Sequence, residues 1–245
     1  MKLFRKHKAS GATVEGRVID ENAPFAIREA YKSLYTSIVY LSIEDKCKKI
    51  AVTSAIPSEG KSTVSANLAC TIAQNSKDKR VLLIDSDMRL PKISKMFSLD
   101  SNASGLSEYL AGVDEAPNFI YLPDKKLTVL SAGGYSVNPT QLISSSAMGK
   151  LFELCEEQFD YVIIDTPPVN VVTDAILINN YINGYVLAIL ADHSDVNNIT
   201  NCVERLNQVG AEIYGFVLSG VRLKGGSGRY KYSNYSKSYS SSERK

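Results

Sequence analysis

Residues 50–63 decide the fold that this sequence predicts: Ile-Ala-Val-Thr-Ser-Ala-Ile-Pro-Ser-Glu-Gly-Lys-Ser-Thr. The stretch begins as a short apolar run that favours a β-strand and then continues into a loop. The loop closes with Gly60-Lys61-Ser62, after which apolar residues recur at helical spacing. A strand, such a loop and a helix in this order form a P-loop, whose backbone N–H groups bind phosphate at the helix N-terminus. The sequence therefore predicts a nucleoside triphosphate site, with Lys61 on the phosphates and the Ser62 hydroxyl on Mg²⁺.

Apolar runs alternate with helical patterns along the rest of the chain. Strands are predicted at 50–54, 80–85, 127–130, 161–165, 185–190 and 213–218. Helices are predicted at 24–43, with Asn22 as the cap, and at 61–74, 106–110, 147–158, 174–181 and 196–209, with a further helix opening at 138–140. Because the strands are continuous apolar runs separated by helices, we expect an α/β fold of the P-loop NTPase type, with a parallel sheet and helices on both faces.

Three aspartates follow predicted strands at the edge of the sheet where ligands bind. Asp85 and Asp87 end the run Val-Leu-Leu-Ile and stand two residues apart, so in an extended segment they would point the same way. Asp165 ends the run Tyr-Val-Ile-Ile. The carboxyl ends of parallel strands form the ligand edge, where Gly60 also falls. Carboxylates beside a P-loop hold Mg²⁺ or its waters, or accept a proton from a nucleophile.

Length and charge suit one domain with two basic ends. The chain has 245 residues and a formal net charge of +2. The first eight residues carry +4 and the segment from Arg222 onward carries +6, which leaves −8 for the middle of the chain. A mildly acidic globular domain does not indicate a nucleic-acid binder. The basic ends suit either solvated tails or contact with an anionic membrane surface.

Cysteine usage and hydropathy indicate a cytoplasmic protein. The four cysteines are scattered, without a Cys-x-x-Cys pair, and there are two histidines. This inventory predicts reduced thiols rather than a disulfide framework or a structural zinc site. The first residues lack the apolar region of a signal peptide, and no run approaches the roughly 20 apolar residues that cross a bilayer. We expect a soluble chain without a membrane span.

These motifs together resemble the bacterial tyrosine kinases of capsular and exopolysaccharide biosynthesis, in their stand-alone cytoplasmic form. The resemblance covers nearly the whole chain. The elements that carry it are the P-loop Ala55-x-x-x-x-Gly60-Lys61-Ser62, the acidic element Asp85-x-Asp87-x-Arg89, the element Asp165-Thr166-Pro167-Pro168, and the tyrosines Tyr230, Tyr232, Tyr235 and Tyr239. The acidic element is the most specific of these, since ordinary P-loop ATPases lack it.

The resemblance implies an enzyme that transfers phosphate from ATP to tyrosine, with ATP and Mg²⁺ as cofactors. It implies catalytic roles for Lys61, Asp85, Asp87 and Asp165, with Asp85 as the candidate that orients or accepts the tyrosine proton. Ser62, Asp87 and Asp165 would then act on the metal, although the sequence does not rank the three aspartates. The residues expected to bind the nucleotide are Ser58, Glu59, Gly60, Lys61, Ser62, Thr63 and Arg89.

The resemblance also implies autophosphorylation of the C-terminal tyrosines and control of polysaccharide assembly. The implied partners are a membrane-embedded activator, which would recruit the protein to the inner face of the membrane, a cognate tyrosine phosphatase, and further copies of the chain in a ring. We expect a basic, mostly irregular segment at 1–23, a kinase domain at 24–224 and a flexible tail at 225–245. The tail is rich in Ser, Tyr, Gly and Lys, and such a composition cannot bury enough apolar surface to order itself.

Three positions depart from the family pattern. Glu29-x-x-Lys32-x-x-Tyr35 stands where the family has Glu-x-x-Arg-x-x-Arg for docking between subunits, and lysine lacks the bidentate fork of arginine. Ser219 stands where an asparagine is usual near the base pocket. Two alternatives therefore stay open. One is a nucleotide-switched positioning ATPase of the partition type, although Ile56 replaces the extra lysine of that class. The other is a non-catalytic nucleotide-binding scaffold.

Overall fold

A computed structural model describes residues 5–6, 18–20, 23–41, 46–134 and 138–221. Eight strands form one sheet in the order β1-β4-β5-β3-β6-β2-β7-β8. Their bounds are β1 Arg5–Lys6, β2 Lys48–Ser54, β3 Val81–Asp85, β4 Ile120–Leu122, β5 Leu127–Leu130, β6 Tyr161–Asp165, β7 Gly184–Leu190 and β8 Ile213–Ser219. All neighbouring strands run parallel except β4 and β5, which are antiparallel.

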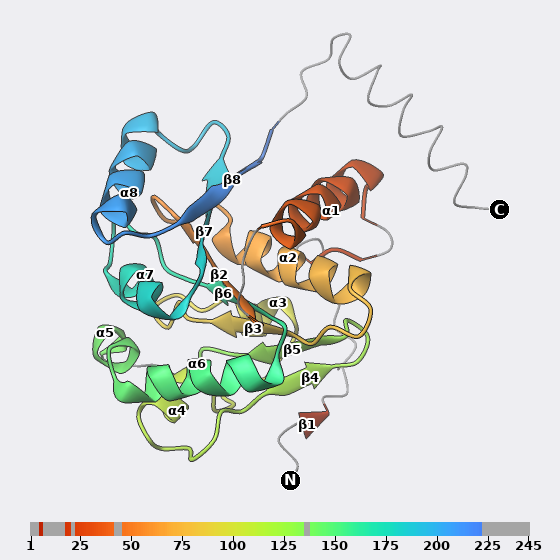
Figure 1. Ribbon diagram of the computed structural model, residues 1–245, viewed down its shortest axis with the longest axis vertical. Helices are drawn as coiled ribbons and strands as arrows, with labels where there is room; N and C mark the ends of the chain where they lie inside the picture. The colour runs from red at the N-terminus through yellow and green to blue at the C-terminus, as the bar shows by residue number, and fades with distance from the viewer. Residues whose placement is uncertain (1–4, 7–17, 21–22, 42–45, 135–137, 222–245) are drawn as a thin grey trace, which may run out of the picture.

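Helices cover both faces of this sheet, as Figure 1 shows. Their bounds are α1 Phe25–Val39, α2 Lys61–Asn75, α3 Ile93–Met96, α4 Leu106–Leu110, α5 Pro139–Ile143, α6 Ser146–Gln158, α7 Asp174–Leu177, the 3₁₀-helix η1 Ile178–Tyr181, and α8 Val196–Gln208. Helices α1 and α2 lie on one side of the sheet, and α6, α7 and α8 lie on the other. The predicted α/β fold is confirmed.

Alternating residues of the central strands build two separate cores. In β3, Leu82 and Ile84 pack toward α6, while Leu83 packs toward α2. In β6, Ile164 faces the first core and Ile163 the second. Successive side chains of a strand point to opposite faces, so a strand buried on both sides must be apolar at every position. This explains why the central strands appear in the sequence as continuous apolar runs.

The sequence missed three short elements and misplaced the ends of one helix. Strands β1 and β4 and helix α3 were not expected. Helix α1 ends at Val39 instead of residue 43, and it begins after Pro24 without a side-chain cap. Proline suits this position because its fixed φ is compatible with a helix start and its missing N–H is not needed there. The expected cap, Asn22, lies outside the described residues.

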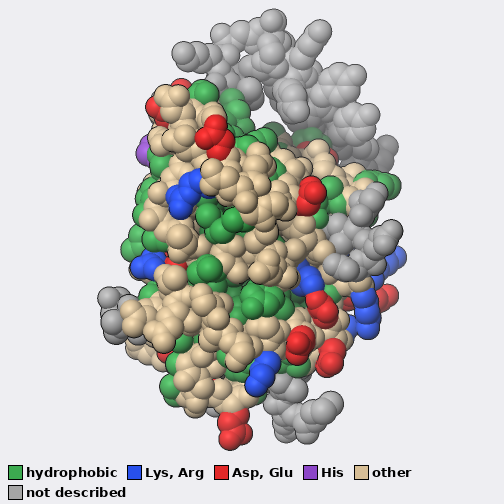
Figure 2. Space-filling view, turned by 60° about the vertical axis from the view of Figure 1, so that its left-hand side comes forward, with side chains coloured by type: hydrophobic (Ala, Val, Ile, Leu, Met, Phe, Trp, Pro, Cys, Tyr) green, Lys and Arg blue, Asp and Glu red, His purple; other side chains and the backbone are tan. Residues whose placement is uncertain are grey.

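The surface combines charges of both signs with exposed apolar side chains. On the face that Figure 2 brings forward, acidic and basic side chains are scattered among apolar and uncharged surface. No helix in the described ranges is both long and apolar enough to cross a membrane. All four cysteines lie within the described ranges, where they are buried and form no disulfide.

Candidate active site

The phosphate loop connects β2 to α2, and part of its backbone is left-handed. Ser58 has a φ of 66° and Gly60 a φ of 89°. Gly60 is the residue that caps α2, and its carbonyl accepts the N–H of Val64 at 2.9 Å. A side chain at Gly60 would strain the backbone, whereas glycine adopts this φ freely. Turns of this kind aim backbone N–H groups at an anion, so the loop has the conformation of a phosphate site.

Lys61 is the first residue of α2 and lies among acidic side chains. It is 7% exposed. Burial lowers the pKa of its ammonium group, while the charges of Asp165, Asp87 and Glu59 act to raise that pKa. The structure therefore brings Lys61 together with two of the three aspartates that the sequence singled out.

Asp165 lies at the end of β6, fully buried against the start of α2. Its Oδ1 lies 3.0 Å from Ser65 Oγ, and the Ser62 hydroxyl also hydrogen-bonds the carboxylate. Its Oδ2 is buried and has no hydrogen-bond partner among the described residues. Burial raises the pKa of Asp165 to about 6, although the Ser62 hydrogen bond and the Lys61 charge oppose the rise. An unpartnered buried carboxylate oxygen suits a cation or a cation-bound water.

The oxygen ligands around Asp165 fit Mg²⁺. Within the described residues, no group of three or more His, Cys, Asp or Glu side chains could hold a metal ion on its own. Mg²⁺ does not require such a cage, since it usually takes one or two carboxylates and completes its shell with water and phosphate oxygens. The Ser62 hydroxyl and the free Oδ2 of Asp165 are ligands of this kind.

Asp85 and Asp87 lie at and just after the end of β3, and the turn follows them at residues 88–89. Asp85 Oδ1 accepts the N–H of Asp87 at 3.2 Å. Asp85 Oδ2 accepts the N–H groups of Lys92 and Ile93 at 3.1 and 3.0 Å. Asp87 Oδ1 accepts the N–H of Leu90 at 3.0 Å. The chain turns because aspartate side chains capture the N–H groups of residues that follow them.

The register of the sheet places Asp85 directly beside Asp165. The two residues are partners across β3 and β6. Burial raises the pKa of Asp85 well above its ordinary value, and the charge of Asp165 adds to the rise. Adjacent buried carboxylates disfavour double ionisation, so this pair holds a proton more readily than free aspartates do.

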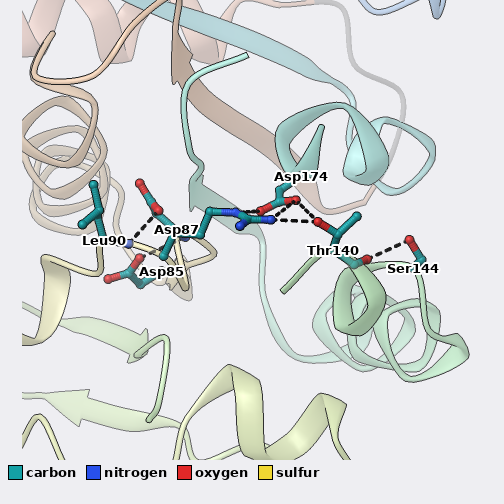
Figure 3. Close-up of polar contacts among 7 residues, drawn as sticks. Asp85, Asp87, Leu90, Thr140, Ser144 and Asp174 are labelled. Atoms are coloured by element: carbon teal, nitrogen blue, oxygen red, sulfur yellow. Dashed lines mark hydrogen bonds and ion pairs between the residues drawn. The ribbon is translucent and has the colours of Figure 1, made fainter. Parts of the chain in front are cut away.

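Arg89 contacts α5 and α7 through Thr140 and Asp174, two residues that Figure 3 labels. Its Nε donates to Asp174 Oδ2 at 2.7 Å, and its Nη2 lies 3.3 Å from Oδ1 of the same carboxylate. Nη2 also donates to Thr140 Oγ1 at 2.8 Å, and this hydroxyl lies 2.7 Å from Asp174 Oδ1. In this structure the guanidinium therefore links the turn after Asp87 to two helices, and its predicted contact with nucleotide stays a prediction.

Glu59 is buried and hydrogen-bonds to other groups of the protein, and its predicted contact with nucleotide stays a prediction. The side chain is 0% exposed, and its Oε2 accepts the N–H of Ile56 at 2.9 Å. Its Oε1 accepts a short hydrogen bond from the Ser194 hydroxyl. Of its predicted neighbours in the nucleotide site, Ser58 is exposed and Thr63 is half-buried.

Comparisons with known proteins identify the family. Residues 47–213 match the family described as AAA domain. Tyrosine-protein kinase YwqD of Bacillus subtilis is 34% identical over 219 residues, which cover 88% of this chain and 91% of YwqD. The chain belongs to the bacterial tyrosine kinases.

Other bacterial tyrosine kinases match over a similar share of this chain. Tyrosine-protein kinase etk of Escherichia coli K12 is 34% identical over 215 residues, which cover 87% of this chain and 29% of etk. The solved kinase domain of Escherichia coli ETK superposes with a TM-score of 0.76 at 33% identity, covering 82% of this chain and 78% of that one. The chain thus corresponds to nearly all of YwqD but to less than a third of etk.

The departures from the pattern of the bacterial tyrosine kinases have partners within the chain. Lys32 forms an ion pair with Glu29 at 2.8 Å along α1. The hydroxyl of Tyr35 lies 3.0 Å from Ser76 Oγ. Ser219 Oγ donates to the carbonyl of Ile189 at 3.2 Å. A Cβ built on Gly60 would lie 3.7 Å from the same Ser219 Oγ. Ser219 is therefore beside the phosphate loop.

Sequence reasoning missed four polar residues that support the kinase site. They are Ser65, Thr140, Asp174 and Ser194. Ser65 was within reach of a pattern argument, because it lies one helical turn after Lys61 and so on the same face of α2. The others sit on loops or helix ends far along the chain from their partners, and no spacing in the sequence marks them.

A hollow of about 510 Å³ lies at the opposite end of the sheet. It is lined by Lys46, Cys47, Glu153, Glu156 and Glu157. These residues belong to the chain before β2 and to the later turns of α6, whereas the phosphate loop follows β2. The hollow is therefore separate from the nucleotide site.

Proposed function

We propose that this protein is an ATP-dependent tyrosine kinase that phosphorylates tyrosines of its own C-terminal segment. The observation that carries the proposal is the convergence of Lys61, Asp85, Asp87 and Asp165 beside a P-loop at one edge of the sheet. The membership in the bacterial tyrosine kinases and the names of its relatives support the same activity.

Lys61 and the loop N–H groups would hold the triphosphate. The transition state of phosphoryl transfer is loose, so an enzyme accelerates it mainly by positioning the reactants and neutralising charge. Ser62 and Asp165, with Asp87 nearby, would hold Mg²⁺, which supplies charge for the β- and γ-phosphates. Lys61 adds a second positive charge, and its burial strengthens its effect on the phosphates.

Asp85 is our candidate for the group that accepts the tyrosine proton. A bond forms between the phenolic oxygen and the γ-phosphorus while the bond to the β–γ bridging oxygen breaks, and ADP leaves. The phenolic proton passes to a carboxylate and then to solvent. Burial and the neighbouring Asp165 raise the pKa of Asp85, and a higher pKa makes a carboxylate a stronger base.

The proposed phosphate acceptors lie outside the described residues. They are Tyr230, Tyr232, Tyr235 and Tyr239, in a segment that carries +6 from Arg222 onward. Each phosphotyrosine adds about −1.5 to −2 at neutral pH. Phosphorylation of all four would therefore cancel or reverse the charge of the segment and change the partners that it attracts.

We further propose the setting that the family suggests. The protein would act with a membrane-embedded activator that recruits it to the inner face of the cell membrane, and a tyrosine phosphatase would reverse its modification. It would assemble with further copies of itself and regulate capsular or exopolysaccharide synthesis.

The test is to incubate the full chain with Mg-ATP, with and without the cytoplasmic segment of the candidate activator, and to map phosphotyrosine by mass spectrometry. We expect phosphate on the four tail tyrosines and its loss in Lys61→Met, because no other side chain on the loop replaces the lysine charge. Release of inorganic phosphate without phosphotyrosine would instead identify a positioning ATPase. Neither product in the presence of the activator would identify a scaffold.

A further inference from the structure

We propose that Glu59 and Ser194 form a clamp that positions the phosphate loop for nucleotide, so that Glu59 acts on the loop and not on the ligand. This inference deepens the proposed function. It needs only one part of that function, the binding of a nucleoside triphosphate by the loop.

The first observation is a buried carboxylate inside an anion-binding loop. Glu59 is 0% exposed, although a negative charge next to a triphosphate site is unfavourable by itself. Its two oxygens are both occupied, one by the N–H of Ile56 and the other by the Ser194 hydroxyl. Both hydrogen bonds join Glu59 to groups of the protein, so the side chain is placed to shape the loop around it.

The second observation is that the partner of Glu59 is itself held firmly. Ser194 Oγ accepts the N–H of Leu190 at 2.8 Å, and the N–H of Ser194 donates to the carbonyl of Leu190 at 2.9 Å. Both bonds tie Ser194 to the end of β7, which pairs with β2 on one side and with β8 on the other. The clamp therefore connects the phosphate loop to a strand that is hydrogen-bonded on both sides within the sheet.

Two neighbouring contacts also hold the phosphate loop in place. His193 Nε2 lies 3.3 Å from the carbonyl of Pro57, which places a second residue of the segment after β7 against the phosphate loop. Ser54 Oγ donates to the carbonyl of Ile56 at 2.7 Å. Ile56 is thus held at both its N–H and its carbonyl, and this fixes the direction in which the following peptide groups point.

The clamp should affect the binding of nucleotide more than the chemical step. A loop that is ordered before the ligand arrives spares the cost of ordering it on binding, whereas a loop that has lost its clamp must be ordered by the nucleotide. Loss of the clamp should therefore raise the KM for ATP strongly and change kcat little.

The experiment measures binding of a fluorescent ATP analogue with Mg²⁺ to the full chain, together with KM and kcat for autophosphorylation. We expect Glu59→Ala to weaken binding about tenfold, which corresponds to about 1.4 kcal/mol. Glu59→Gln should retain most of the affinity, because its amide can still accept from Ile56 and donate to Ser194 Oγ. Glu204→Ala is the matched control, since it removes an exposed glutamate from α8.

A double-mutant cycle separates a clamp from two independent structural roles. Ser194→Ala alone should weaken binding, and adding it to Glu59→Ala should have little further effect, since the pair acts as one unit. Additive effects, or wild-type affinity in folded Glu59→Ala or Ser194→Ala, would overturn the proposal. If the wild-type chain binds nucleotide but forms no phosphotyrosine, the proposed function fails while the clamp is still tested by the binding data.

Discussion

At the scale of single residues, the site depends on carboxylates that the fold keeps away from water. Asp85 and Asp165 are both 0% exposed and lie side by side. A buried acid that gains no compensating cation favours its neutral form. The free protein therefore carries an electrostatic cost at neutral pH, which a bound cation would relieve.

This cost predicts a distinct pH dependence of stability for Asp165. Burial raises the pKa of Asp165 to about 6 in the folded chain, above the ordinary value of about 4. Its contribution to stability is thus fully present below pH 4 and is lost as the pH rises through 6. Relative to wild type, Asp165→Asn should gain on the order of 1–3 kcal/mol in unfolding free energy between pH 4 and pH 7. Urea unfolding of the nucleotide-free protein at both pH values measures the difference.

Asp160 is a control whose pKa shifts in the opposite direction, downward instead of upward. Burial acts to raise the pKa of Asp160, but hydrogen bonds from the N–H of Arg80 and from Lys79 outweigh it and lower that pKa. Its contribution is present at neutral pH and is lost as the pH falls, so Asp160→Asn should lose stability mainly above pH 4. Parallel pH profiles for Asp165→Asn and wild type would contradict the prediction.

At the scale of elements, the turn after β3 is held by a charge contact that crosses the fold. Arg89 in this turn pairs with Asp174 at the start of α7, and Thr140 of α5 completes the contact. Asp174 is 1% exposed while the Arg89 side chain is 39% exposed, so one partner is buried and the other is half-solvated. The same turn follows Asp85 and Asp87.

Loss of this contact should affect both stability and metal dependence. In Arg89→Ala the buried Asp174 carboxylate loses its cation, which we expect to lower the unfolding free energy by about 1–3 kcal/mol. The half-saturating Mg²⁺ concentration for nucleotide binding should also rise, because Asp87 directly precedes the turn. Thermal unfolding and Mg²⁺ titration check the two effects. Arg80→Ala, which removes an exposed arginine at 3.7 Å from Asp160, should change neither.

Elements differ in how far the sequence could predict them. The strands that carry the site were predictable, because burial on both faces demands continuous apolar runs. Strand β4 was not, since Ile-Tyr-Leu at 120–122 is too short for a periodic pattern and its pairing with β5 depends on a turn with Lys126 at a φ of 53°. The partners of Arg89 and Glu59 were equally hidden, because they lie 85 and 135 residues away.

At the scale of the whole molecule, α1 departs at two positions from the motif that the resemblance implies for docking between subunits. Lys32 pairs with Glu29 of its own helix, and Tyr35 contacts Ser76, the residue that follows α2. Neither side chain offers the bidentate fork through which arginine binds a carboxylate. We therefore expect weak self-association of the isolated chain.

Restoring the arginines should strengthen assembly. The double variant Lys32→Arg/Tyr35→Arg should raise the association constant by about tenfold, or about 1.4 kcal/mol. Sedimentation velocity over a range of concentrations measures the change, and Lys150→Arg on α6 is a control that leaves α1 intact. Equal association of the double variant and wild type would mean that this face of α1 does not govern assembly.

The tail and the kinase domain should be separable. Removal of the chain after Arg222 should abolish self-phosphorylation, because it deletes the four proposed acceptors. Nucleotide affinity should be unchanged, since the phosphate loop and its acidic partners lie between residues 55 and 165. Equilibrium binding and phosphotyrosine mapping check both parts. A fall in affinity would show that part of the base pocket belongs to the removed segment.

The burial of all four native cysteines has a practical consequence for studying this enzyme. Their side chains lie between 0 and 1% exposed, and burial raises the pKa of Cys70 and Cys202 to about 12. Thiolate is the reactive form, so alkylating reagents should leave the folded native chain untouched. A cysteine introduced at an exposed position such as Asn197 would then accept a fluorophore selectively, without prior removal of native thiols.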